Sequence, residues 1–81
     1  MPTIHREEGF AFRVYPGNHE PPHVHAISAN GEARIAIGNQ SEPPAILTVF
    51  RLDERQVVRA YRIVEQQQEA FLDAWRRIQD S

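Results

Sequence analysis

The fold is decided by residues 23–37, which read HVHAISANGEARIAI. In this stretch, two segments of alternating apolar and polar side chains, 23–29 and 32–37, flank the dipeptide Asn30-Gly31. Such alternation is typical of β-strands that bury one face. Asn-Gly is a strong short-range hairpin signal and favours a type I′ turn, in which both central residues have positive φ. We therefore expect an antiparallel hairpin whose second strand buries Ala33, Ile35 and Ile37.

Further strands are expected on both sides of this hairpin. Residues 9–15 (GFAFRVY) alternate between large apolar and other side chains, which predicts a strand before it. Residues 45–50 (AILTVF) are rich in β-branched side chains and predict a strand after it. The Pro43-Pro44 pair favours an edge position for this last strand, because proline lacks the N–H that an inner strand donates. The chain is thus expected to form a small antiparallel sheet of three to four strands.

The residues after Leu52 are helix formers and include no glycine or proline. Asp53 is suited to be the N-cap, and Gln56 can complete a capping box with it. A single helix over 54–79 would be about 40 Å long at 1.5 Å per residue, longer than a sheet of this size. Two arrangements follow. Either one long helix overhangs and packs on a second copy in a homodimer, or the segment breaks near 65–68 into two consecutive antiparallel helices packed on one sheet face.

The whole chain, 1–81, is expected to be a single α+β domain, strand-rich over 1–51 and helical over 53–80. It contains no cysteine, which excludes disulfides, thiolate metal sites and cysteine nucleophiles. No apolar run approaches the roughly 18 residues of a membrane span, and the first residues lack a signal-peptide pattern. We therefore expect a cytoplasmic protein without membrane contact. The net charge of −2 disfavours binding of nucleic acid by overall charge alone.

Three histidines fall within seven residues: His19, His23 and His25. Residues two apart on a strand point to the same face, so His23 and His25 are expected to lie side by side with Val24 turned away. Histidine suits acid–base chemistry near neutral pH, and neighbouring imidazoles can also bind one metal ion. The three are therefore candidate catalytic residues and, if a divalent metal is present, its candidate ligands. Histidines that only fill hydrogen bonds or face solvent are the alternative.

The chain has nine arginines and no lysine. The planar guanidinium of arginine can bind phosphate in a bidentate manner. On the strands, Arg13 and Arg34 are candidate contacts for a phosphate or a partner. On the helical segment, Arg55, Arg59 and Arg62 follow one another at i, i+4 and i+7 and form a stripe. This stripe could face phosphate or an acidic partner, although a solvated helix face is the commoner origin of such a pattern.

Several of these features together resemble one protein family. It is the small bacterial family known as domain of unknown function 4160, and the Pro-Pro-His-x-His segment is its most specific part. Many of its members carry an acidic residue just before the first histidine, where this chain has Asn18. The residues that carry the resemblance are Met1-Pro2-Thr3-Ile4, Gly9 and the strand after it, His19-Glu20-Pro21-Pro22-His23-Val24-His25, the strand at 32–37 and Trp75.

The resemblance implies a context more than an activity, since members are typically encoded beside another small protein and are often described as toxin–antitoxin components. We therefore expect one component of a two-protein module of toxin–antitoxin type that acts through a His19, His23 and His25 surface. If it is an enzyme, we expect RNA or another phosphodiester as substrate, with His23 and His25 as the acid–base pair. An arginine, Arg13 or Arg34, would then hold the phosphate. Two alternatives stay open: a non-enzymatic module that binds a small protein partner through a sheet edge or the arginine stripe, and a metal-binding domain with three histidine ligands.

Overall fold

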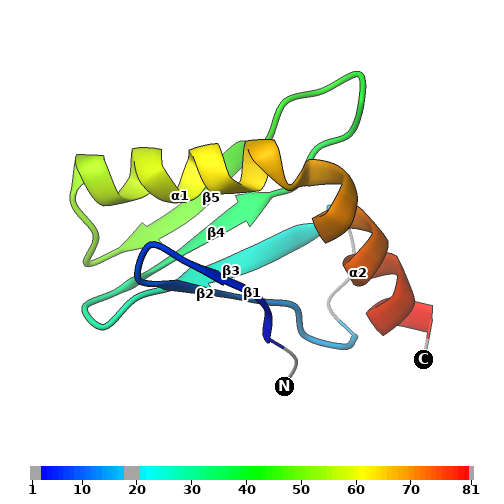
Figure 1. Cartoon of the computed structure of the whole chain (residues 1–81), viewed down its shortest axis with the longest axis horizontal. Helices are drawn as coiled ribbons and strands as arrows, with labels where there is room; N and C mark the ends of the chain where they lie inside the picture. Colours follow the sequence, from blue (N-terminus) through cyan, green and yellow to red (C-terminus); the bar gives the residue numbers. More distant parts are fainter. Residues whose placement is uncertain (1–2, 18–20, 81) are drawn as a thin grey trace.

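The computed structural model describes residues 3–17 and 21–80 and shows one antiparallel sheet followed by two helices (Figure 1). The strands lie side by side in the order of the sequence. The chain is therefore α+β, as predicted, but the sheet has five strands and not three to four. The elements are β1 Thr3–Glu7, β2 Phe10–Arg13, β3 His23–Ile27, β4 Glu32–Ala36, β5 Ala45–Phe50, α1 Glu54–Gln66 and α2 Gln68–Asp80.

The strand missing from the sequence prediction is β1, at one edge of the sheet. It is joined to β2 by the two residues Glu8 and Gly9, whose φ angles are 51° and 85°. Two consecutive positive φ values are those of a type I′ turn, whose twist matches the twist of paired strands. The predicted strand at 9–15 therefore begins one residue later, and the residues before it form the other half of a tight hairpin.

The predicted type I′ turn at Asn30-Gly31 is wrong, although the hairpin itself is present. β3 and β4 are joined by the four residues 28–31, and neither Asn30 nor Gly31 is among the described residues with positive φ. The Ser28 hydroxyl accepts hydrogen bonds from the amides of Asn30 and Gly31, each at 3.3 Å, and so organises a longer loop. Hydrogen bonds to the Ser28 hydroxyl thus stabilise a four-residue loop in place of the expected two-residue turn.

Gly31 has a different role from the one expected. A Cβ atom at this position would collide with the backbone carbonyl oxygens of Phe50 and Arg51, where β5 ends. Glycine is therefore required by the close approach of two backbones, because any side chain would push the loop away from the end of β5.

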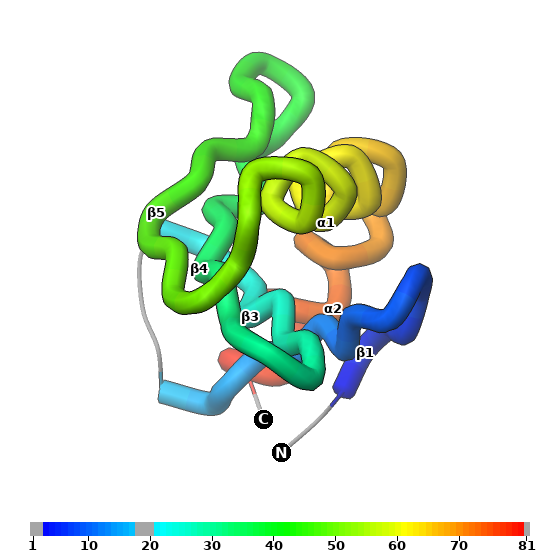
Figure 2. Tube along the Cα trace, turned by 90° about the vertical axis from the view of Figure 1, so that its left-hand side faces the viewer, coloured from blue at the N-terminus to red at the C-terminus, as the bar shows by residue number. Residues whose placement is uncertain are grey.

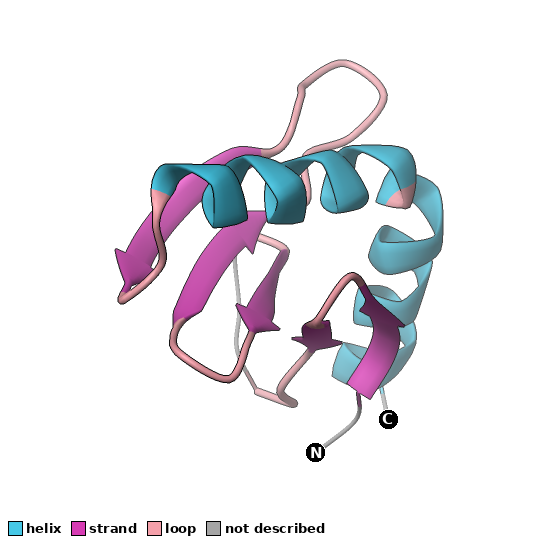
Figure 3. Ribbon diagram, turned by 60° about the vertical axis from the view of Figure 1, so that its left-hand side comes forward, coloured by secondary structure: helices cyan, strands magenta, loops and turns pink. Residues whose placement is uncertain are grey.

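One face of the sheet is covered by the two helices and holds the hydrophobic core (Figure 3). Buried positions alternate along β4 and, apart from His23, along β3, as expected for strands with one covered face, whereas β2 buries Phe10, Ala11 and Phe12 in succession. Neither helix covers the opposite face, which we call the helix-free face. The largest fully buried side chains are Phe12, Val14, Val24, Ile35, Ile37, Ile63 and Val64.

Asp53 caps α1 as predicted. Its carboxylate accepts a hydrogen bond from the Gln56 amide at 2.8 Å, and the Gln56 side chain accepts one from the Asp53 amide at 3.0 Å. This reciprocal capping box satisfies donors that the first turn of a helix otherwise leaves unpaired.

The helical segment breaks at Gln67, which confirms the two-helix alternative. α2 turns steeply away from α1, however, and does not run back antiparallel to it (Figure 1). The Gln68 side-chain amide donates to the carbonyl oxygens of Ile37 at 2.9 Å and Glu42 at 3.2 Å. These bonds anchor the start of α2 to the loop before β5, so the direction of α2 is set by side-chain contacts and needs no glycine or proline.

β5 forms the sheet edge opposite β1, which confirms the edge position predicted from Pro43-Pro44 (Figure 2). Within the described ranges, neither helix has the length and apolar content that crossing a lipid bilayer requires.

Candidate functional site

The helix-free face carries a row of side chains that crosses all five strands. Residues directly opposite one another in an antiparallel pair share a face. The observed register links five such residues from one edge of the sheet to the other. We call this set the sheet row; it consists of Thr3, Arg13, His25, Arg34 and Thr48.

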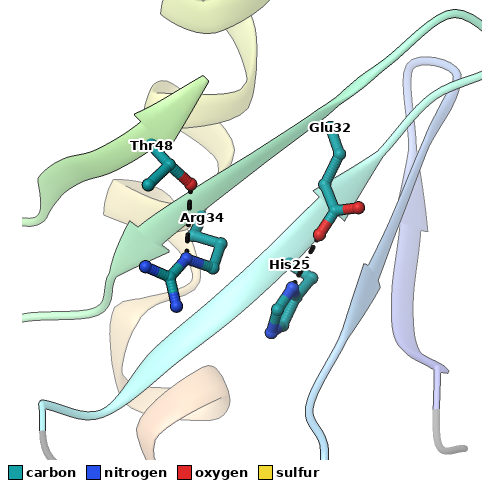
Figure 4. Close-up of polar contacts among 4 residues, drawn as sticks. All are labelled: His25, Glu32, Arg34 and Thr48. Carbon is teal, nitrogen blue, oxygen red and sulfur yellow. Dashed lines mark hydrogen bonds and ion pairs between the residues drawn. The ribbon is translucent and has the colours of Figure 1, made fainter. Parts of the chain in front are cut away.

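His25 lies at the centre of the sheet row, between Arg13 and Arg34. Its Nδ1 lies 2.7 Å from a carboxylate oxygen of Glu32 (Figure 4). An ionised carboxylate can only accept, so the Nδ1–H of His25 donates and the neutral ring keeps its lone pair on Nε2. That Nε2 is buried and has no hydrogen-bond partner among the described residues. The two residues form a histidine–carboxylate dyad whose basic nitrogen is unused.

His23 lies beside His25 on the same face, as predicted, and Val24 is buried on the other side. The two ring centroids are 5.2 Å apart. The Nδ1–H of His23 donates to the carbonyl oxygen of Pro21 at 2.9 Å, because a carbonyl can only accept. Both imidazoles are thus held in the same tautomer, with Nε2 as the nitrogen left for proton exchange.

Tyr15 closes one side of the histidine pair. Its ring meets the His25 ring edge-on, with centroids 4.5 Å apart and an interplanar angle of 88°. The Gln79 side-chain amide, near the end of α2, donates to the Tyr15 carbonyl oxygen at 3.0 Å and accepts from the Gly17 amide at 3.1 Å. The last turn of α2 therefore fixes the backbone that presents Tyr15 to His25.

The two strand arginines complete the site on either side of His25. The Nε–H of Arg34 donates to Oγ1 of Thr48 at 3.3 Å, which orients the guanidinium along the face (Figure 4). The Nε of Arg13 is buried and has no hydrogen-bond partner among the described residues. Arginines beside an imidazole with an open nitrogen suit an anionic group, since phosphate oxygens accept strong hydrogen bonds from guanidinium.

The arginine stripe of the helix lies elsewhere. Arg55, Arg59 and Arg62 are exposed on α1, on the helix-covered side of the sheet. Arg59 forms an ion pair with Glu8 at 3.3 Å, and the three arginines line a surface hollow of about 810 Å³. The structure thus brings the strand arginines to the histidines and keeps this stripe apart from them.

His19, the remaining predicted site residue, lies outside the described residues, as does Glu20. Within the described ranges, no group of three or more metal-binding side chains is placed to hold a metal ion. A metal site made of His19, His23 and His25 therefore stays a prediction.

Four residues of the site are absent from the sequence prediction: Thr3, Tyr15, Glu32 and Thr48. The signal for Glu32 lies in the hairpin register, since it directly faces Ile27 and is diagonal to His25. The roles of Tyr15 and Thr48 depend on pairings with two further strands, for which the sequence holds no local signal.

The fold and site define a small α+β protein with two helices on one face of a five-stranded sheet and a histidine–arginine row on the other. The chain belongs to the family described as Domain of unknown function (DUF4160), which it matches over residues 9–76. The matched segment contains the whole sheet row except Thr3. No curated protein and no solved structure matches the chain.

Proposed function

We propose that this protein is one component of a two-protein module of toxin–antitoxin type and that its helix-free face binds and cleaves single-stranded RNA. The observation that carries the RNA part is the succession of Arg13, His25 and Arg34 across three strands, with His23 next to it. The module part of the proposal rests on the resemblance described in the sequence analysis, which implies a small protein encoded beside this one.

An open antiparallel sheet face suits a single RNA strand. RNA-binding sheets stack unpaired bases on aromatic rings and hold the backbone with basic side chains. Phe50 lies directly opposite Glu32 on this face and is 63% exposed. The guanidinium carbon of Arg51 lies 5.3 Å from its ring centroid. A base stacked on Phe50 would place the neighbouring phosphates along the sheet row.

The histidine pair supplies the acid–base chemistry of the proposal. Nε2 of His25 takes the proton of a ribose 2′-hydroxyl, the 2′-oxygen attacks the adjacent phosphorus, and the bond from phosphorus to the 5′-oxygen breaks. His23, as imidazolium, gives its proton to that leaving oxygen. The products are a 2′,3′-cyclic phosphate and a 5′-hydroxyl. Because Nε2 of His25 is buried, the bound nucleotide must displace neighbouring side chains to reach it.

Charged side chains stabilise the charges that develop on His25 and on the phosphate. The Glu32 carboxylate stabilises the cation that forms on His25, as the carboxylate of a catalytic triad does for its histidine. Arg13 and Arg34 offset the negative charge that develops on the phosphoryl oxygens.

The test is cleavage of an end-labelled single-stranded RNA by the purified chain, alone and with its neighbouring gene product. A single 2′-deoxy substitution at the cleaved position should block cleavage and leave binding intact. His23→Ala and His25→Ala should each lower the rate by about 100-fold or more. Arg76→Ala, an exposed arginine on α2, is the matched surface control and should cleave normally. RNA that binds and is never cut would overturn the catalytic part, and RNA that does not bind would overturn the whole RNA proposal.

The metal alternative is tested on the same preparation. Elemental analysis of protein purified without an affinity tag should find no stoichiometric zinc, nickel, copper or iron if the histidines act as an acid–base pair. One equivalent of metal, lost on His23→Ala, would favour the metal-binding domain instead.

A further inference from the structure

The outer side of β5 is a sheet edge with one bulge, at Leu47, where the register against β4 shifts. This six-residue strand is exposed along its whole length and contains no charged residue. Among the described residues, four of the five exposed large hydrophobic side chains lie on it: Ile46, Leu47, Val49 and Phe50. Soluble proteins usually protect such an edge with charges, bulges or a covering segment, because its unpaired backbone groups pair readily with another strand.

We propose that β5 pairs with β5 of a second copy of this chain, antiparallel and about a two-fold axis, so that the two sheets join into one. An antiparallel pair of identical strands is self-complementary, since each contact is made twice by the same two residues. A second copy therefore satisfies both bare edges at once, whereas a foreign strand would satisfy one edge and would need its own matching apolar pattern.

The two faces of β5 define the register of this pairing. Ile46 and Val49 lie opposite Ile35 and Ala33 and so share the helix-covered side. Shifting a strand by one residue exchanges its faces. Because Leu47 is bulged, Ala45 and Phe50 share the other side, so the register that places Ile46 opposite Val49 of the second copy also places Ala45 opposite Phe50 and matches faces on both sides of the bulge.

The charges flanking β5 favour a second copy in this register. Glu42 precedes the strand and Arg51 follows it, and both are exposed. Antiparallel pairing brings the end where Arg51 leaves β5, with a φ of 57°, toward the end of the second copy's β5 that follows Glu42. Charges of opposite sign therefore flank both ends of the pair, and the six strand residues between them are uncharged.

The absence of cysteine allows a direct test of the register. Ile46→Cys and Val49→Cys are purified separately, mixed and exposed to a mild thiol oxidant. We expect disulfide-linked dimers from the mixture, because opposed residues in an antiparallel pair have Cα atoms about 4.5–5.5 Å apart, within disulfide range. Either variant alone should cross-link far less, since identical positions then lie three residues apart, about 10 Å. Equal cross-linking in all three samples would overturn the register.

The dimer itself is tested by sedimentation of the full chain. The wild type should sediment as a dimer, and Val49→Lys, which puts a charge opposite Ile46 in the joined edge, as a folded monomer. Ala70→Lys, an exposed position on α2, is the matched control and should stay dimeric. A wild type that stays monomeric at high concentration overturns the proposal, whether or not another protein then binds β5. Val49→Lys leaves the helix-free face of each copy unchanged, so RNA binding per chain reports separately on the proposed function.

Discussion

Glu32 on β4 accepts a hydrogen bond from Nδ1 of His25 on β3 across a distance of 2.7 Å. The histidine side chain is 12% exposed and the carboxylate is 42% exposed, so the dyad has a buried base and a hydrated anion. A second histidine–carboxylate pair, formed by Nε2 of His5 and Glu7 at 2.8 Å, is partly exposed and lies where the His5 ring contacts Phe12. The chain therefore offers an internal comparison between two chemically similar dyads.

Replacing the carboxylate of the first dyad should impair chemistry while leaving the fold intact. We expect Glu32→Gln to lower the RNA cleavage rate about 10- to 100-fold, the usual effect of losing a group that orients a histidine. Nitrogen-15 NMR should show the His25 proton shifting from Nδ1 toward Nε2. Glu7→Gln is the matched control and should change neither the RNA cleavage rate nor the tautomer of His25. A Glu32→Gln variant with normal rate and normal tautomer would remove Glu32 from the site.

Removing a strand arginine should weaken RNA binding in a salt-dependent way. Arg34→Ala should lower affinity and reduce the slope of log K against log salt concentration by about 0.7 for each lost phosphate contact with a single strand. Filter binding at several salt concentrations measures both quantities. Arg76→Ala should keep the wild-type slope, and the same loss at Arg76 and Arg34 would show that binding follows overall charge.

Gly31→Ala should destabilise the protein by about 1–3 kcal/mol, the range for overpacked sites. The new Cβ atom would press on the carbonyl oxygens of Phe50 and Arg51, so that the loop or the end of β5 must move. Urea unfolding followed by circular dichroism gives the free energy of unfolding. Asn30→Ala, at the exposed neighbouring position, should change it by no more than about 0.5 kcal/mol. Equal effects at the two positions would contradict the close backbone contact.

Asp53→Ala should cost about 0.5–2 kcal/mol through loss of the helix cap. The Gln56 amide would lose its side-chain acceptor, and the capping box would open. Thermal unfolding should detect the loss as a lower midpoint. Asp73→Ala, an exposed carboxylate inside α2, provides the comparison and should be close to neutral; a midpoint unchanged by Asp53→Ala would show that the cap is dispensable.

The sequence predicts the histidine face because strand alternation is a local property. Val24 is apolar and its two neighbours are polar, so the period of two alone places His23 and His25 on one side. The edge position of β5 follows equally from the chemistry of proline. Predictions of this kind need no knowledge of which strands pair.

The pairing of His25 with Glu32 could not be predicted from the sequence, because it depends on the length of the loop between β3 and β4. A two-residue turn at Asn30-Gly31 would set Ala36 opposite His25, whereas the observed four-residue loop sets Arg34 there. Glu32 then moves to the diagonal position beside His25. The local preference of Asn-Gly is outweighed by the Ser28 hydroxyl and by packing of Gly31 against the end of β5. Such contacts involve residues that are distant in sequence, so short-range signals do not contain them.

The two hydrogen bonds of Gln79 have a consequence for the order of assembly during synthesis. The five strands pair with their immediate predecessors, so the sheet can grow as the chain emerges, through contacts that are local in sequence. Gln79, by contrast, reaches back 64 residues to Tyr15 and 62 residues to Gly17. The support behind the Tyr15 ring therefore forms only after α2 has been synthesised. A nascent chain would carry its histidines without that support until α2 has been synthesised. The histidine pair would take its final geometry only after translation has passed the last turn of α2.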